Sequence, residues 1–145
     1  MKNKKQIGIW LDYREAFVVE LREDDAPVIQ HLRSGIEPGV YKGGVRSKTP
    51  YGPQVGPNEQ RFEEKRHHHE KAYFEKLIDA IDPEADQLII FGPAEAKFGL
   101  QNAIGAIKHY HPQVMNVFPA DSMSENQIVA RVREVFESQH VKVNM

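Results

Sequence analysis

Apolar and polar positions alternate near the start of the chain in a way that predicts three short β-strands. Residues 6–11 and 16–21 are rich in β-branched and aromatic side chains, and a polar turn separates them. A third strand opens at Pro27 and has its apolar positions between Val28 and Leu32. Because these strands follow one another on short connections, we expect them to pair as an antiparallel meander.

This pattern ends between Gly35 and Pro57, a stretch that holds six of the ten glycines and four of the nine prolines. Loops longer than about 12 to 15 residues are uncommon in compact domains, and those that occur are often functional or disordered. We therefore predict a long loop over residues 35–57. Composition leaves two interpretations open, a binding loop and a surface excursion without a role.

A helical period follows the predicted loop. Asn58 is a good N-cap, and we expect the helix to run for about six turns before Asp82-Pro83 ends it. The residues that recur at helical spacing on its apolar face are Phe62, His69, Tyr73, Leu77, Ile78 and Ile81.

Two strands and two helices complete the pattern. Residues 88–91 form a continuous apolar run, which is typical of a strand covered on both faces, and residues 114–118 are a fifth strand. Ser124 and Gln127 predict a capping box at the start of the last helix. The apolar stripes of the two helices would be Leu100, Ile104 and Ile107, then Ile128, Val132, Val135 and Phe136.

The predicted order is therefore β-β-β-α-β-α-β-α. A meander followed by alternating helices and strands predicts one mixed five-stranded sheet, with right-handed crossovers that place helices on its faces. This is the order of ribonuclease H-like α/β domains. Since 145 residues is the usual size of one domain, we expect a single domain over residues 1–145.

Composition narrows the classes of function. The 40% hydrophobic and 28% charged residues are typical of a globular chain, and no segment approaches the ~20 apolar residues that span a bilayer. The chain has no cysteine, which excludes disulfides, thiolate catalysis and cysteine-ligated metals. A reducing compartment fits this composition best, so we expect a cytoplasmic protein with no membrane partner.

Charge is distributed unevenly, although the net charge is only −2. Residues 1–71 carry 13 Lys and Arg against 11 Asp and Glu, whereas residues 72–145 carry 6 against 10. The predicted loop contributes Lys42, Arg46 and Lys48 and has no acidic residue after position 37. A local basic patch could therefore meet phosphate groups even though the whole molecule would be repelled by them.

Nuclease chemistry of the ribonuclease H type needs several carboxylates around two divalent metals. Asp12 stands at the end of the first strand, and Glu63 or Glu64 could come from the first helix, but the fourth strand ends in Phe91-Gly92 where a further acid is needed. The metal site therefore lacks a ligand. Asp12 is more simply a turn residue whose side chain caps local amides.

Three adjacent histidines occupy positions 67–69. Consecutive helical side chains diverge by about 100°, so the three cannot bind one ion from a single helix face, and the workable pairs join Glu63 or Glu64 to the histidine four residues later. We therefore expect no bound metal or other cofactor. His68 and His69 remain possible functional residues, with solvated helix histidines as the simpler interpretation.

The junction between the fourth strand and its helix is a candidate anion site. Gly92-Pro93 turns the chain, the amides of the first helical turn are free, and Lys97 stands beside them. An RNA phosphate is a plausible ligand. The simpler interpretation is a Gly-Pro helix start with an ordinary surface lysine.

In their order along the chain, these motifs resemble the middle domain of archaeo-eukaryotic class I peptide-chain release factors and its stand-alone bacterial relatives, the translational machinery proteins. The resemblance covers nearly the whole chain and implies a ribonuclease H-like, ribosome-facing module. Its segments are Trp10–Ala16, the glycine-rich loop leading into Arg61-Phe62, the helix residues Lys65–His69, and Phe91-Gly92-Pro93 with Lys97.

Peptide release is not implied by this resemblance. In release factors that activity needs a Gly-Gly-Gln tripeptide just before the Arg-Phe pair, and the aligned residues here are Val55-Gly56-Pro57. The earlier pair Gly43-Gly44 is followed by Val45, and Gln54 is the only nearby glutamine in a similar loop. We therefore expect a protein that does not hydrolyse peptidyl-tRNA.

The leading hypothesis is a non-catalytic, translation-associated factor whose partner is the ribosome or ribosomal RNA. A small metal-dependent hydrolase that uses Asp12 and the helix histidines is one alternative, and a protein-interaction module without RNA binding is another. The residues expected to contact phosphate are Lys42, Arg46, Lys48, Arg61, Lys65, Gly92 and Lys97.

Overall fold

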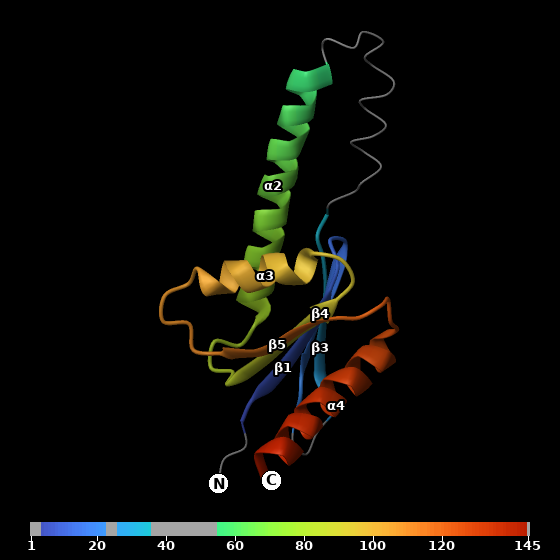
Figure 1. Cartoon of the computed structure of the whole chain (residues 1–145), viewed down its shortest axis with the longest axis vertical. Coiled ribbons are helices and arrows are strands. Elements are labelled where there is room, and N and C mark those ends of the chain that lie inside the picture. The colour runs from blue at the N-terminus through green and yellow to red at the C-terminus, as the bar shows by residue number, and fades with distance from the viewer. Residues whose placement is uncertain (1–3, 23–25, 36–54, 145) are drawn as a thin grey trace.

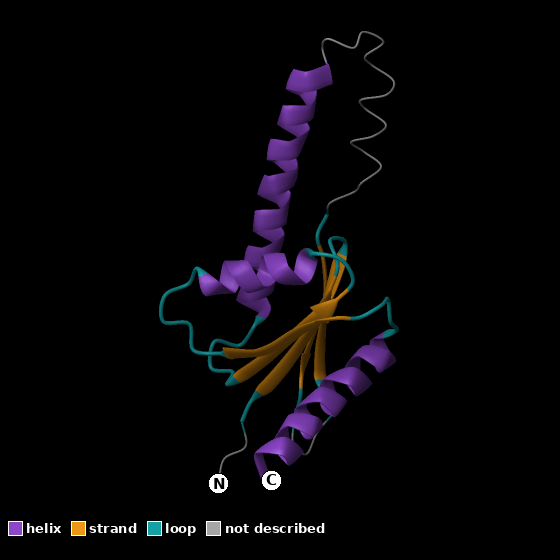
Figure 2. Ribbon diagram, viewed as in Figure 1, coloured by secondary structure: helices purple, strands orange, loops and turns teal. Residues whose placement is uncertain are grey.

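A computed structural model describes the backbone of residues 4–22, 26–35 and 55–144, and the side chains of residues 4–22, 26–35 and 68–138. Five strands form one mixed sheet in the order β3-β2-β1-β4-β5 (Figure 2). The strands are β1 (Gln6–Leu11), β2 (Glu15–Glu20), β3 (Val28–Arg33), β4 (Gln87–Gly92) and β5 (Gln113–Pro119).

Strand directions confirm the predicted meander and the predicted fold class. β2 is antiparallel to both β1 and β3, whereas β4 is parallel to β1 and β5 is parallel to β4. The fold is an α/β arrangement of the ribonuclease H-like type. Helices α2 (Val55–Ala80) and α3 (Ala96–Gly105) lie on one face of the sheet, and α4 (Glu125–Asn144) lies on the other (Figure 1).

Each face of the sheet has its own apolar core. On one face, Tyr73 and Leu77 of α2, Ile81 just after it, and Leu100 and Ile104 of α3 pack on the strands. On the other face the core is formed with Ile128, Val132 and Phe136 of α4. The apolar run of β4 is buried throughout, as expected for a strand covered on both sides.

The start of α2 differs from the sequence prediction. The helix begins at Val55, so Asn58 lies inside its first turn and the predicted loop ends at least three residues earlier than Pro57. Proline is tolerated in the first turn, where its missing N–H leaves no intrahelical bond unmade. Residues 36–54 of the predicted loop lie outside the described residues.

Two apolar stripes were also predicted too long. His69 is exposed on α2 and does not join the buried face formed by Tyr73 and Leu77. Helix α3 ends at Gly105, and Ile107 beyond it is 38% exposed. In both cases the apolar spacing in the sequence extends beyond the part of the helix that packs on the sheet.

Much of α2 extends away from the sheet. The helix has 26 residues, or about 39 Å at 1.5 Å per residue. Among its described side chains, the buried ones are Tyr73, Phe74 and Leu77 in the C-terminal part, and the N-terminal part of the helix projects beyond the body (Figure 1). Within the described residues, none of the helices is long and apolar enough to cross a membrane.

Candidate nucleic-acid interface

Two of the predicted site residues, Asp12 and Gly92, lie at one edge of the sheet. β1, β3, β4 and β5 all run in the same direction, so their carboxyl ends meet at this edge. Asp12 follows β1, Gly92 ends β4, and the predicted loop follows β3 in sequence. This is the edge from which α2 projects (Figure 1).

Asp12 holds the turn between β1 and β2. Its Oδ1 accepts hydrogen bonds from the backbone N–H of Arg14 at 2.7 Å and of Glu15 at 2.9 Å. Its backbone carbonyl accepts a hydrogen bond from the Tyr73 hydroxyl at 2.9 Å, which ties the turn to α2. The interpretation of Asp12 as an amide-capping turn residue is therefore confirmed.

Burial keeps Tyr73 protonated. Loss of hydration raises the pKa of its hydroxyl well above the usual value, and the negative charges of Asp12 and Glu15 raise it further. The hydroxyl is thus a permanent donor to the Asp12 carbonyl. No group of three or more histidine or acidic side chains in the described part of the chain is placed to hold a metal ion.

Gly92 has a structural role that its position in sequence did not show. Its φ is +149°, and a Cβ at this residue would lie 2.1 Å from the carbonyl oxygen of Leu11. Only glycine allows this approach between the ends of β1 and β4. The packing of two strands therefore explains the glycine without any bound phosphate.

Lys97 is buried, so its interpretation as an ordinary surface lysine is wrong. It is only 4% exposed, its Nζ donates a hydrogen bond to the carbonyl of Ala94, and its Nζ lies 4.7 Å from the centroid of the Phe98 ring. The side chain folds back over the first turn of α3. Ala94, with a φ of 56°, turns its carbonyl toward this ammonium group.

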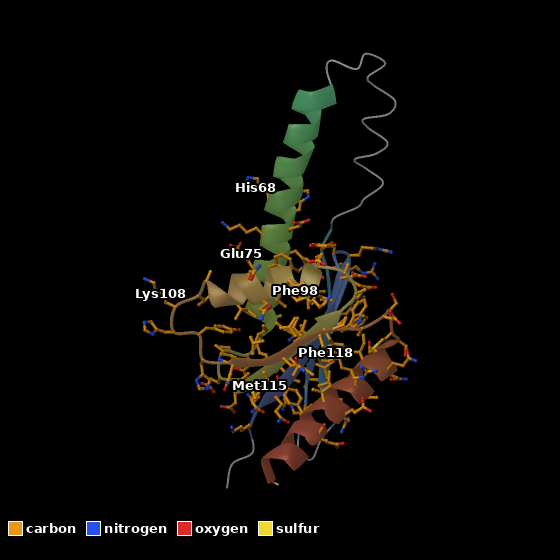
Figure 3. All side chains as sticks on the ribbon, viewed as in Figure 1. His68, Glu75, Phe98, Lys108, Met115 and Phe118 are labelled. Atoms are coloured by element: carbon orange, nitrogen blue, oxygen red, sulfur yellow. The ribbon has the colours of Figure 1, made fainter. Side chains whose placement is uncertain are left out.

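The remaining candidates are spread along α2 and the predicted loop. His68 and His69 are exposed, and Figure 3 shows His68 on the projecting part of the helix. Arg61 and Lys65 lie further along the same projection, where the backbone alone is described. Lys42, Arg46 and Lys48 lie outside the described residues. The structure thus brings Asp12 and Gly92 together and places the helix candidates away from both.

Sequence reasoning missed an aromatic row on the α4 face of the sheet. Strand register places one aromatic or imidazole ring opposite the next on all five strands. Ring centroids are 4.4 Å apart at one end of the row and 4.9 Å apart at the other. From β3 to β5 the row consists of His31, Phe17, Trp10, Phe91 and Phe118.

Comparison with known proteins gives structural neighbours only. No protein-family profile and no curated protein sequence matches the chain. A crystal structure of an archaeal translation termination factor, aRF1, matches with a TM-score of 0.53 and 14% identity over 93% of this chain and 36% of that protein. Pelota from Archaeoglobus fulgidus matches with a TM-score of 0.42 and 14% identity over 97% of this chain and 38% of that protein.

The chain therefore spans little more than a third of the length of these two proteins. The match to aRF1 includes nearly every element of the sheet and its helices, since it covers 93% of this chain. At 14% identity it shows that the two share a fold. This chain has the ribonuclease H-like fold found in part of an archaeal translation termination factor.

Proposed function

We propose that this chain acts as a single-domain, non-catalytic, translation-associated factor that contacts ribosomal RNA through the predicted basic loop and the projecting part of α2. The observation that carries the proposal is the shape of α2. A helix of 26 residues is anchored by its C-terminal part and extends its N-terminal part away from the body (Figure 1). A projection of this kind can enter a recess that the body cannot.

The charge of the predicted loop supports an RNA partner. This loop carries Lys42, Arg46 and Lys48 without an acidic residue after position 37. Arg61 and Lys65 follow on the helix, where residues 55–71 carry four basic and four acidic side chains. Lysine and arginine bind phosphate through charge, and a glycine-rich backbone can approach a phosphate closely. The fold shared with a translation termination factor supports the ribosome as the source of that RNA.

The non-catalytic part of the proposal rests on how the candidate groups are used. The Asp12 carboxylate is engaged with two backbone amides of its own turn. The Lys97 ammonium is buried against Ala94 and Phe98. Both side chains therefore have roles in local structure, which supports a non-catalytic protein.

The test is the salt dependence of RNA binding. With about three to five phosphates neutralised, log affinity should fall against log salt with a slope of roughly −2 to −4. Replacing Arg46 and Lys48 by alanine should flatten the slope by about one to two units, because fewer counterions are released from the RNA when fewer phosphates are contacted. The variant should keep its thermal stability, since we expect charges of the predicted loop to contribute little to folding.

A matched control removes two positive charges elsewhere. Lys108 lies in the turn after α3 and Arg133 lies on α4, and both are exposed. The Lys108→Ala/Arg133→Ala variant should keep the parental slope. If both double variants change the slope equally, RNA is held by overall charge and the proposed contact surface is wrong.

A further inference from the structure

At the edge strand β3 the aromatic row ends in the imidazole ring of His31, whose orientation is fixed by two contacts. The His31 ring stacks on the Phe17 ring with centroids 4.4 Å apart and planes 3° from parallel. Its Nε2 lies 2.7 Å from Oε1 of Glu15 on the neighbouring strand. Stacking fixes the plane of the ring and the carboxylate fixes its rotation, so this surface ring is held in one orientation.

The second face of the His31 ring points toward the open edge of the sheet. Phe17 lies directly opposite His31 on β2, so the rings stack across the strands and the free face looks away from β2. In the described part of the chain no strand follows β3 in the sheet. Helix α4 packs mainly on β1 and β2, and the His31 side chain remains 35% exposed.

A guanidinium group accompanies this flat surface. Arg33 lies two residues after His31 on β3, so both side chains belong to the same face of the sheet. Glu15 is directly opposite Arg33 in register, yet its Oε1 is bonded to His31. Among the described residues no carboxylate lies within salt-bridge distance of Arg33.

We propose that His31 and Arg33 form a nucleotide-binding shelf for single-stranded RNA, in which a base stacks on the free face of His31 and its phosphate pairs with Arg33. Stacking on an aromatic face is the sequence-tolerant way in which proteins hold unpaired bases. A guanidinium supplies the charge and the donors that a phosphate needs. The proposal rests on the proposed function and adds a base contact to its phosphate contacts.

An RNA strand fits this shelf better than a protein segment does. The exposed residues of β3 are Val28, Gln30, His31 and Arg33, so most of the exposed side chains on this edge strand are polar or charged. A ring fixed in plane beside a guanidinium with no carboxylate partner among the described residues matches the alternation of base and phosphate in a nucleotide.

The experiment compares two oligonucleotides that differ only in their bases. The full chain is titrated by fluorescence anisotropy with an end-labelled octamer of adenosine and with an abasic octamer that has the same number of phosphates. The parent should bind the adenosine octamer about tenfold more tightly, since one stacked base supplies an advantage of this size. His31→Ala should lose that preference, and His31→Phe should keep it because a flat ring remains stacked on Phe17.

Controls separate the shelf from general effects. His111→Ala removes an exposed histidine from the opposite end of the sheet and should keep the parental preference. Arg33→Ala should weaken binding of both octamers by a similar factor, because it removes a phosphate contact. Thermal unfolding of each variant shows whether the fold is retained.

Each result has one meaning. Equal binding of both octamers by the parent, with the Arg46→Ala/Lys48→Ala variant still weakened, overturns the shelf and leaves the proposed function standing. A base preference that survives in His31→Ala also overturns the shelf. Concentration-dependent dimers that His31→Ala dissolves, without a base preference, would show that a second copy covers this edge. Absence of binding to both octamers and to ribosomes overturns both proposals.

Discussion

Replacing Gly92 by alanine adds only a methyl group, yet we expect it to destabilise the fold strongly. A methyl group there would meet the Leu11 carbonyl oxygen at 2.1 Å, and its φ of +149° is unfavourable for any other residue. We expect Gly92→Ala to lower the free energy of unfolding by about 2 to 4 kcal/mol. Denaturant unfolding measures the change.

Gly105 supplies the matched control for this substitution. It is the last residue of α3, and an added Cβ would meet no atom within 4 Å. Gly105→Ala should leave stability unchanged or raise it by up to about 1 kcal/mol, because alanine is the better helix former. Equal losses from the two substitutions would contradict the close approach of β1 and β4.

The rate at which an amine-reactive reagent modifies Lys97 tests whether this side chain is buried. The side chain is 4% exposed and its Nζ is bonded to the Ala94 carbonyl, whereas Lys108 is exposed in the turn after α3. Acylation by an amine-reactive reagent should therefore modify Lys97 much more slowly than Lys108. Peptide mass spectrometry of the folded and the unfolded protein measures both rates. Similar rates in the folded protein would show that Lys97 is open to solvent and would restore it as an anion contact.

For single residues, the sequence predicted local contacts but not tertiary ones. The turn role of Asp12 followed from its residue type, because the carboxylate needs only amides two and three residues away. The burial of Lys97 depends on how its long stem folds over Ala94 and Phe98. The stacking of His31 on Phe17 depends on strand register. Both are tertiary features that spacing along the chain does not encode.

At the scale of single elements, the start of α4 is a two-way cap. The Ser124 hydroxyl accepts a hydrogen bond from the Gln127 N–H at 3.2 Å, and Gln127 Oε1 accepts one from the Ser124 N–H at 2.9 Å. Ser124→Ala should cost about 1 kcal/mol of unfolding free energy. Ser122→Ala, two residues earlier and exposed, should stay within about 0.5 kcal/mol of the parent.

A double-mutant cycle tests whether these two bonds act together. Because each side chain caps the backbone of the other residue, Ser124→Ala and Gln127→Ala should lose less together than the sum of their separate losses. Denaturant unfolding of the parent, both single variants and the double variant supplies the cycle. Strict additivity would mean that the two caps are independent.

The strands were predictable because their apolar runs are short and bounded by turn residues. The capping box was predictable because its two bonds join residues three apart in sequence. The limits of α2 and α3 were not, since the apolar spacing along the chain does not mark the residue at which a helix begins or ends. Val55 therefore precedes the cap expected at Asn58, and Ile107 lies beyond the end of α3.

Across the whole molecule, an electrostatic cluster joins three elements at the amino ends of the parallel strands. Lys5 Nζ lies 2.6 Å from Asp82, and the Lys5 backbone N–H donates to Asp86 at 2.8 Å. Asp86 also lies 3.3 Å from Nε2 of His111. The cluster connects the start of β1, the turn after α2 and the start of β5.

These bonds predict a loss of stability in acid. The bond from Lys5, followed by that from the Glu84 N–H, lowers the pKa of Asp82, and the bonds from Lys5 and His111 lower the pKa of Asp86. A carboxylate with a lowered pKa stabilises the fold above its unfolded value of about 3.9 and loses that contribution as pH falls through the folded value. The melting temperature should therefore fall as the pH drops below about 4.

Asp86→Ala should melt below the parent at neutral pH, and the difference should shrink toward pH 3 as the parent carboxylate becomes protonated. Asp79→Ala is the matched control, because this exposed aspartate on α2 makes no hydrogen bond or ion pair with a described residue. Differential scanning calorimetry between pH 3 and pH 7 follows both variants. A difference for Asp86→Ala that does not change with pH would show that its charge has no part in stability.

The most direct test of a ribosome-facing role is co-sedimentation of the full chain with purified ribosomes through a sucrose cushion. We expect the parent to pellet with ribosomes at low salt and to be released as salt rises, because phosphate contacts release counterions. The Arg61→Ala/Lys65→Ala variant, which alters the projecting part of α2, should pellet less than the Lys108→Ala/Arg133→Ala control. A parent that stays in the supernatant at low salt, or a projection variant that pellets as well as the control, would contradict the proposed function.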